Sequence, residues 1–238
     1  MPGLKPSDRA PGLLLGEGVQ LGADVELGGY VVIHAGTRVA ARAVIQDHVV
    51  IGKPPILGAA STSRRDRPPP ASLGEEAAVC TGAVIFAGAE IAPSAIVGDQ
   101  AQVRERARIG AASVVGRGAA VDNEVTIGAG VKVESNCYLA AGTTIEDGVF
   151  VGPGVTLAND RTMSGHPSGM RREAPTLRRR CRIGAGAVIG PDVEVGEEAI
   201  VGAGAVVVAS VAPRKVVVGV PARELRDVTD ADLAVPRS

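Results

Sequence analysis

The sequence predicts an all-β fold: a parallel β-helix of six-residue repeats with two extruded loops and a short C-terminal helix. The first observation is that aliphatic residues recur at every sixth position from Val79 to Leu157 without a break. The second is that the position four residues after each of them is small or β-branched, as at Ala83 and Ala89. The third is the composition: 32 glycines supply tight corners, and a chain with no Trp, two Tyr and two Phe must build its core from aliphatic residues.

A period of six fits neither an amphipathic helix nor a long alternating strand. It fits a short strand followed by a corner, with the aliphatic and the small side chain both pointing inward. Three such units close one triangular coil, and stacked coils pair as parallel strands about 4.8 Å apart. The second inward residue must be small because the narrow interior cannot hold two large side chains on each edge. Repeats of this kind are typical of β-helices.

The same repeat runs earlier, from Leu15 to Ile51, and later, from Ile183 to Val207. The gaps between the three blocks are not multiples of six, so two segments must leave the coil. We therefore divide the chain into a lead-in at 1–14, a β-helix at 15–212 with extruded loops at about 53–78 and 158–182, and a C-terminal tail at 213–238.

Two segments outside the repeat have their own signals. In the tail, Leu225, Val228 and Leu233 fall on one face of a helix over 222–234, which predicts the short C-terminal helix. The proline-rich stretch at 63–70 excludes a helix from the first loop. That loop either reaches a neighbouring subunit or a nucleotide, or has no fixed structure.

Charge and composition exclude several classes of partner. A formal net charge of −1 offers no basic footprint for nucleic acid. No apolar run is long enough to cross a bilayer, and residues 1–14 lack the hydrophobic core of a signal peptide. The three cysteines are odd in number and match no metal spacing, so we expect reduced thiols in a cytoplasmic protein.

The aliphatic–Gly–x–x–small–x repeat resembles the left-handed β-helix hexapeptide-repeat acyltransferase superfamily. The segment 211–223 resembles the closing part of acetyl-CoA-dependent members. The stretches 131–138, 145–160 and 174–187 are similar to the branch that N-acetylates nucleotide-linked amino sugars. The resemblance covers about 79–226. It implies a left-handed coil, a homotrimer with sites between neighbouring coils, acetyl-CoA as co-substrate, and transfer of acetyl to the amino group of a nucleotide-linked sugar.

Two other functions stay open. One is O-acetylation of a sugar or small alcohol, and the other is a non-catalytic scaffold or binding protein. Loops on a rigid scaffold favour a site over a pure scaffold. No metal is expected, because a carbonic anhydrase with this fold needs three histidines on zinc, two of them five residues apart. His34, His48 and His166 contain no such pair.

The second loop carries the catalytic candidates. His166 could be a general base, since an imidazole titrates near working pH, and its Gly-His-Pro setting resembles that of sugar O-acetyltransferases. It could instead contact the substrate or be a solvated loop residue. Asn159 and Asp160 directly follow a strand, where they could orient an amine; the alternative is an Asx-type turn.

The resemblance also implies where the cofactor and substrate bind. Coenzyme A would lie along backbone groups at small residues, with cations after the last coil for its phosphates; these candidates are Gly184, Ala185, Gly202, Ala203, Arg214, Lys215 and Arg223. Each of the three cations could equally be a solvated surface charge. Substrate contacts are expected at Asn136, Tyr138, Arg178 and Arg180. Asn136 and Tyr138 could instead be solvated positions on the outer face of the coil, and the two arginines could merely cover its edge.

Overall fold

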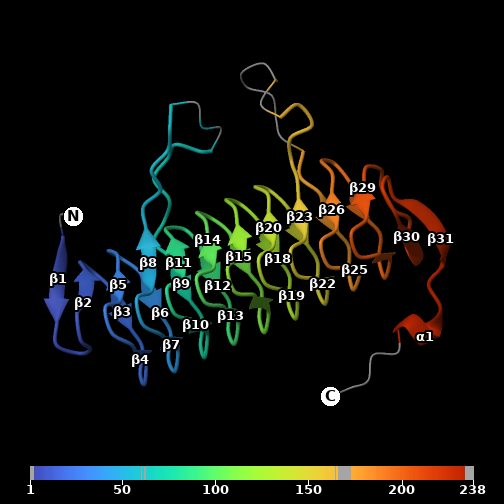
Figure 1. Ribbon diagram of the computed structural model, residues 1–238. Coiled ribbons are helices and arrows are strands. Elements are labelled where there is room, and N and C mark those ends of the chain that lie inside the picture. The colour runs from blue at the N-terminus through green and yellow to red at the C-terminus, as the bar shows by residue number, and fades with distance from the viewer. Residues whose placement is uncertain (1–2, 60, 62, 164, 166–172, 234–238) are drawn as a thin grey trace.

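The computed structural model describes residues 3–59, 61, 63–163, 165 and 173–233, and shows one long three-sided β-helix (Figure 1). Its strands form three sheets of 11, 11 and 9 strands, which we call sheets A, C and B. The chain visits them in the order A, B, C in every coil. The predicted all-β hexapeptide-repeat β-helix is confirmed.

Nearly all the strands are two residues long, as a six-residue repeat requires. Sheet A contains β1 (Leu4–Ser7), β2 (Leu13–Gly16), β5 (Val32–Ile33), β8 (Val50–Lys53), β11 (Val84–Phe86), β14 (Gln102–Val103), β17 (Ala120–Val121), β20 (Tyr138–Leu139), β23 (Thr156–Leu157), β26 (Val188–Ile189) and β29 (Val206–Val207). Sheet B contains β3 (Gln20–Leu21), β6 (Arg38–Val39), β9 (Ser72–Leu73), β12 (Glu90–Ile91), β15 (Arg108–Ile109), β18 (Thr126–Ile127), β21 (Thr144–Ile145), β24 (Thr176–Leu177) and β27 (Glu194–Val195).

The third sheet ends in the C-terminal hairpin. Sheet C contains β4 (Glu26–Leu27), β7 (Val44–Ile45), β10 (Ala78–Val79), β13 (Ile96–Val97), β16 (Val114–Val115), β19 (Lys132–Val133), β22 (Phe150–Val151), β25 (Arg182–Ile183), β28 (Ile200–Val201), β30 (Lys215–Val218) and β31 (Arg223–Asp227). We name the three corners by the sheets they join: A–B, B–C and C–A.

The core is the interior of the prism. In the repeats the second strand residue points inward and is buried, while the first points outward. The small residue four positions later is also buried, as at Ala83 and Ala107. The largest fully buried side chains, such as Ile85 and Leu139, are all aliphatic. The six-residue period therefore follows from filling a narrow interior with one large and one small side chain on each edge.

Both extruded loops leave at the A–B corner and project from the same edge of the prism (Figure 1). The first, which we call the arm (54–71), lies between β8 and β9, and the second loop (158–175) lies between β23 and β24. The coil resumes earlier than the predicted ends at 78 and 182, because Leu73 and Leu177 are already in phase with the repeat and point inward. Five strand spacings, or about 24 Å, separate the two loops along sheet A.

Hairpins close both ends of the coil. In the predicted lead-in, β1 pairs antiparallel with β2. At the other end β31 pairs antiparallel with β30, and within the described part of the tail Asp230–Leu233 form a helix, α1. The predicted short helix is present, but its predicted extent over 222–234 is wrong, since Leu225 lies on β31 with 62% of its surface exposed. The free edge of β30 offers backbone hydrogen bonds that a helix there would leave unpaired.

Two further findings concern cysteines and membranes. Cys80, Cys137 and Cys181 are free thiols, and burial raises the pKa of the Cys181 thiol to about 12. Within the described parts of the chain, no helix has the length and apolarity needed to cross a bilayer.

Two threonines at equivalent inward positions give a matched test of core polarity. Thr37 and Thr143 each lie four residues after the inward residue of a sheet A strand, and both are fully buried. Thr143 Oγ1 donates to the Ala140 carbonyl at 2.7 Å, whereas Thr37 Oγ1 finds no partner among the described residues. We expect Thr37→Val to raise the free energy of unfolding by about 1 kcal/mol and Thr143→Val to lower it by about 1 kcal/mol, measured by urea denaturation. Equal effects of the same sign would contradict this assignment.

Candidate functional site

The root of the second loop is fixed by hydrogen bonds between coils. Asn159 is 9% exposed, and its Nδ2 donates to the carbonyl of Ala141 in the preceding coil at 2.9 Å. Asp160 Oδ1 accepts hydrogen bonds of 2.8 Å from both the backbone nitrogen and the hydroxyl of Thr162. This is an Asx-type turn, the alternative considered from the sequence. His166, the predicted base, lies outside the described residues.

A third contact ties this root to the following coil. Arg161 Nη2 donates to the Pro191 carbonyl at 3.3 Å and lies 3.7 Å from the Asp192 carboxylate. Three successive coils therefore hold residues 159–161 at the A–B corner. The first residues of the second loop are therefore held rigidly against the coil.

The C–A corner has a different character in its last two coils, where its residues are all Gly and Ala. Gly184, Ala185, Gly202 and Ala203 lie there in two stacked coils. A Cβ on Gly184 would come within 2.5 Å of the backbone nitrogen of Ala203. Such close backbone approach leaves a smooth edge on which Ala185 and Ala203 are exposed. Asn136 is at the same corner, two coils before Gly184, with a φ of 59°.

The catalytic candidates and the cofactor candidates lie at opposite ends of the sheet A strands, at the A–B corner and the C–A corner. The chain runs from Ala185 at the C–A corner through β26 to Gly190 at the A–B corner, where Pro191 contacts the second loop. Five residues of extended chain span about 16 Å. Within one subunit these two groups therefore do not face a common point.

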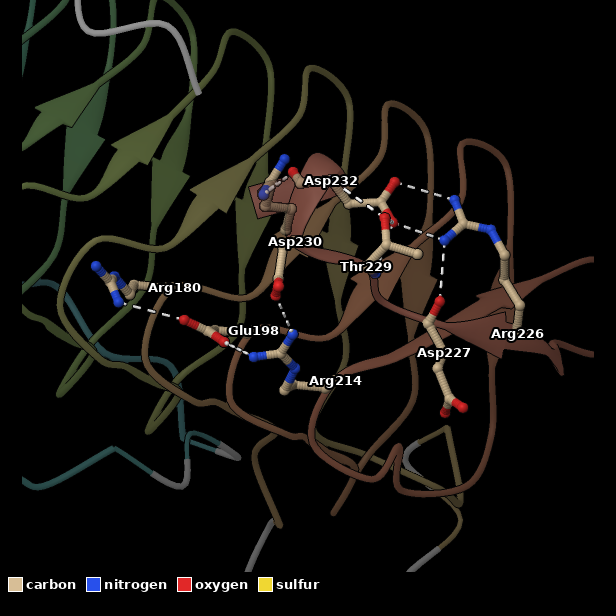
Figure 2. Close-up of polar contacts among 9 residues, drawn as sticks. Arg180, Glu198, Arg214, Arg226, Asp227, Thr229, Asp230 and Asp232 are labelled. Carbon is tan, nitrogen blue, oxygen red and sulfur yellow. Dashed lines mark hydrogen bonds and ion pairs between the residues drawn. The ribbon is translucent and has the colours of Figure 1, made fainter. Parts of the chain in front are cut away.

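Three of the predicted cations, Arg178, Arg180 and Arg214, lie at the third corner, B–C, and each has a carboxylate partner. Glu198 bridges Arg180 at 3.2 Å and Arg214 at 3.4 Å, and Arg214 also pairs with Asp230 at 3.0 Å (Figure 2). Arg178 pairs with Glu146 at 2.8 Å and with Glu194.

The remaining two cations lie beyond the last coil. Lys215 Nζ is 2.7 Å from both Glu224 and Asp227, and the hydrogen bond to Asp227 is the main cause of its raised pKa. Arg223 lies on β31, where Nη1 donates to the Ala222 carbonyl. The structure thus does not bring the predicted cations together with Asn159 or Gly184.

Sequence analysis missed a chain of side chains on the outer face of sheet A, near the A–B corner. Lys53 Nζ lies 5.2 Å from the centre of the Phe86 ring, and Arg104 Cζ lies 5.5 Å from it. Arg104 also holds Glu105 with two bonds, Nε–Oε2 at 2.9 Å and Nη2–Oε1 at 2.8 Å. Its Nη1 is 3.1 Å from Asp122 Oδ1.

The chain of contacts ends at a predicted substrate residue. Tyr138 donates its hydroxyl proton to Asp122 Oδ2 at 3.3 Å. Burial alone would lower the pKa of Arg104, but Glu105 and Asp122 together raise it. We call Lys53, Phe86, Arg104, Asp122 and Tyr138 the sheet A ladder. A signal existed in the sequence, since residues 104 and 122 occupy a strand-end position that is often Gly or Ala in the other sheet A repeats.

The arm folds over the same corner. Asp66 Oδ2 lies 3.0 Å from Arg106 Nη2, which also donates to the Asp66 carbonyl at 2.8 Å. Ser63 Oγ is 3.4 Å from Asn123 Oδ1. These contacts place the arm beside the ladder, so the first loop has a defined position in its described part.

The two histidines within the described residues, His34 and His48, lie at different corners. His34 lies at the A–B corner, whereas His48 lies at the C–A corner and stacks on Tyr30 with ring centres 5.3 Å apart. In the described ranges, no three or more His, Cys, Asp or Glu side chains gather as a metal site would require.

Comparison with known proteins identifies the repeat. The family described as "Bacterial transferase hexapeptide (six repeats)" matches residues 124–159 and 174–209, the coils on either side of the second loop. These coils carry the hexapeptide repeat of that transferase family.

Individual relatives agree with this family. A galactoside O-acetyltransferase from Escherichia coli (strain K12) is 40% identical over 50 residues, which are 21% of this chain and 25% of that protein. The chain therefore matches only a quarter of that relative's length. UDP-N-acetylglucosamine acyltransferases from Arabidopsis and Campylobacter jejuni superpose with TM-scores of 0.59 and 0.52 at 14% and 18% identity. Each alignment covers 94% of this chain and 75% of the other, and at this identity shows the fold alone.

Proposed function

We propose that this hexapeptide-repeat protein transfers an acetyl group from acetyl-CoA to a small-molecule acceptor. The observation that carries the proposal is the match of the transferase repeat to the coils around the second loop. The rigid root of that loop and the smooth C–A corner support it. An extended thioester could lie along the peptide groups of Gly184 and Gly202, while an acceptor approaches from the A–B corner.

The two corners come together when copies of the chain associate, and we propose a homotrimer. The outward strand positions of sheet B are all polar, as at Arg38, Glu90 and Arg108. By contrast, sheet A presents half-buried valines there, including Val32 and Val188, and sheet C carries aliphatic residues at several of these positions. Sheets A and C meet at the C–A corner, so apolar faces flank that corner and sheet B faces water. A stable monomer in sedimentation experiments would contradict this proposal.

In the proposed reaction, the acceptor nucleophile attacks the thioester carbonyl and the thiol of coenzyme A leaves. The nucleophile must lose a proton, and His166 is our candidate for the group that takes it. Peptide N–H groups at the smooth corner could stabilise the developing oxyanion. Asn159 and Asp160 hold the loop root through the contacts described above, so we assign them the positioning of the acceptor.

For the acceptor, we propose the amino group of a nucleotide-linked amino sugar, on the resemblance of the stretches at 131–160 and 174–187. A specific observation favours a second candidate, O-acetylation of a sugar hydroxyl. It is the 40% identity over 50 residues to a galactoside O-acetyltransferase. The two acceptors differ in need for a base, because a neutral amine attacks unaided more readily than a hydroxyl.

The direct test is release of coenzyme A thiol from acetyl-CoA in the presence of UDP-linked amino sugars or simple galactosides. Mass spectrometry of the products distinguishes an amide from an ester. Absence of acetyl-CoA binding in calorimetry would refute the proposal and favour a non-catalytic β-helix.

The role of His166 gives a prediction with a large effect. If it is the general base, His166→Ala lowers kcat by about 10²–10⁴-fold with little change in the KM of acetyl-CoA. Asn159→Ala serves as the comparison, because its loss removes the hydrogen bond to Ala141 and disturbs the root. A small effect of His166→Ala together with a large effect of Asn159→Ala would instead indicate attack by an amine without a protein base.

A further inference from the structure

The outer face of sheet A changes character between the arm and the second loop. Its outward strand residues are valine in β5, β8 and β11, and again in β26 and β29. Over the four strands between, they are Gln102, Ala120, Tyr138 and Thr156. A polar window thus interrupts an otherwise aliphatic face, and the two extruded loops bound it.

The ladder crosses this window. Each of its five residues comes from a different coil, from β8 to β20, and each contacts the next. Glu105 holds Arg104, the central residue of the ladder, because its carboxylate is 1% exposed and binds Arg104 through both oxygens. A buried ion pair with good geometry has little freedom to rearrange.

The end of the ladder lies next to the candidate reaction corner. Tyr138 pairs in register with Thr156 of β23, and the chain leads from the end of β23 directly to Asn159. Three residues of extended chain separate Thr156 from Asn159, so the backbone of Tyr138 lies about 10 Å from that corner along the strand direction. The ring is 43% exposed, while its hydroxyl is held by Asp122.

We propose that Tyr138 is the acceptor-specificity residue of this protein and that Asp122, Arg104 and Glu105 are positioning residues for it. The acceptor is a saccharide whose ring packs on the phenol and whose hydroxyl or ammonium groups lie beside the Asp122 carboxylate. The inference rests on the proposed acetyl transfer for its biological meaning, but the binding it describes can be measured without acetyl-CoA.

The chemistry of the window favours a saccharide over other acceptors. A tyrosine offers an apolar ring face and a polar tip, which suits a sugar with its alternating C–H and hydroxyl surfaces. Lys53 and Arg104 balance Glu105 and Asp122 over the whole ladder, but the charged group bonded to Tyr138 is the Asp122 carboxylate, which favours an amine over an anionic group at that end. The row of polar residues leads away from the reaction corner, which fits an acceptor longer than one small alcohol.

The scarcity of aromatic residues provides a clean binding probe. The chain has no Trp and two Tyr, so Tyr30→Phe leaves Tyr138 as the sole source of tyrosine fluorescence. A phenol bonded to a carboxylate emits weakly, so Asp122→Asn in that background is expected to raise the emission. Titration with methyl galactoside or glucosamine, neither of which absorbs where tyrosine does, is expected to change the emission saturably in the Tyr30→Phe protein.

Steady-state kinetics test the same residue in the reaction. We expect Tyr138→Leu to raise the KM of the acceptor about tenfold and Asp122→Asn to raise it about fivefold, with the KM of acetyl-CoA unchanged. Glu90→Gln is the matched control, since Glu90 pairs with Arg108 across coils at 3.5 Å on the solvent-facing sheet B. We expect no change in either KM for that variant.

The outcomes separate this inference from the proposed function. If the wild-type protein releases no thiol from acetyl-CoA, the proposed function fails, and the fluorescence titration still decides the role of Tyr138. If neither sugar changes the emission, the inference is overturned. It is also overturned if Tyr138→Leu and Glu90→Gln have the same effect, or if the KM values of both substrates rise together, because a merely structural role would produce that result.

Discussion

Replacing Gly110 by alanine is expected to lower the free energy of unfolding by about 3 kcal/mol. Gly110 follows β15 at the B–C corner, where the next coil passes directly against it. A Cβ there would lie 2.7 Å from the Ala129 nitrogen and closer still to the Gly128 carbonyl oxygen. These are backbone atoms, so neither can swing aside, and overpacking of this kind costs about 1–3 kcal/mol or more.

The clash would also disturb a buried hydrogen bond. Ser113 Oγ donates to the Gly128 carbonyl at 2.7 Å and accepts from the Val131 nitrogen at 2.9 Å. Gly58→Ala is the matched control, because nothing lies within 4 Å of a Cβ at that position in the arm. Urea denaturation at one fixed protein concentration measures both, since association changes apparent stability. A loss below about 0.5 kcal/mol for Gly110→Ala would show that the coils can separate, contrary to the rigid stacking described.

Removal of the Arg104 guanidinium is the second change with a large expected effect on stability. Arg104→Ala would leave Glu105 almost fully buried without its cation, and Asp122 would lose one of its partners. Breaking a buried pair in this way costs about 3–5 kcal/mol. We expect a loss near the lower end, about 3 kcal/mol, because the Arg104 side chain is itself 27% exposed.

A double variant separates the loss of the pair from the penalty of an unpaired charge. Arg104→Met with Glu105→Leu removes both charges and keeps the volume, so it should recover most of the stability lost in Arg104→Ala. The Glu90–Arg108 pair again supplies the comparison, since both side chains are more than half exposed and Arg108→Ala should cost less than about 1 kcal/mol. If Arg104→Ala and Arg108→Ala lowered the free energy of unfolding equally, Glu105 would not depend on its ion pair with Arg104.

Much of the fold could be predicted from the sequence because the repeat has a local steric cause. An inward position accepts only residues that fit a narrow prism, so the aliphatic and small positions recur with a fixed spacing that a single sequence reveals. Leu73 and Leu177 show the limit of the method, since each is in phase but stands alone next to a loop. The predicted C-terminal helix was too long for a related reason: the edge of β30 pairs with residues that also fit a helical face.

The site was less predictable because its contacts join different coils. A coil of three repeats makes residues 18 positions apart neighbours, so Arg104 and Asp122 were within reach of sequence reasoning. The contact between Arg178 and Glu146 could not be predicted in this way, because the second loop lies between them and their separation is no longer 18 residues. Only the structure could show that Arg178, Arg180 and Arg214 are paired with carboxylates at the B–C corner.

The sequence by itself determined the β-helix, its period and the two places where the period breaks, because these depend on the size of side chains that fill the interior. The tertiary structure decided which corner each outward side chain occupies and what it contacts. The corner that a residue occupies depends on how many residues each loop removes from the coil, and no local sequence pattern predicts that number. Asn159, Gly184 and Arg214 all lie in the C-terminal part of the chain, yet they lie at three different corners of the prism.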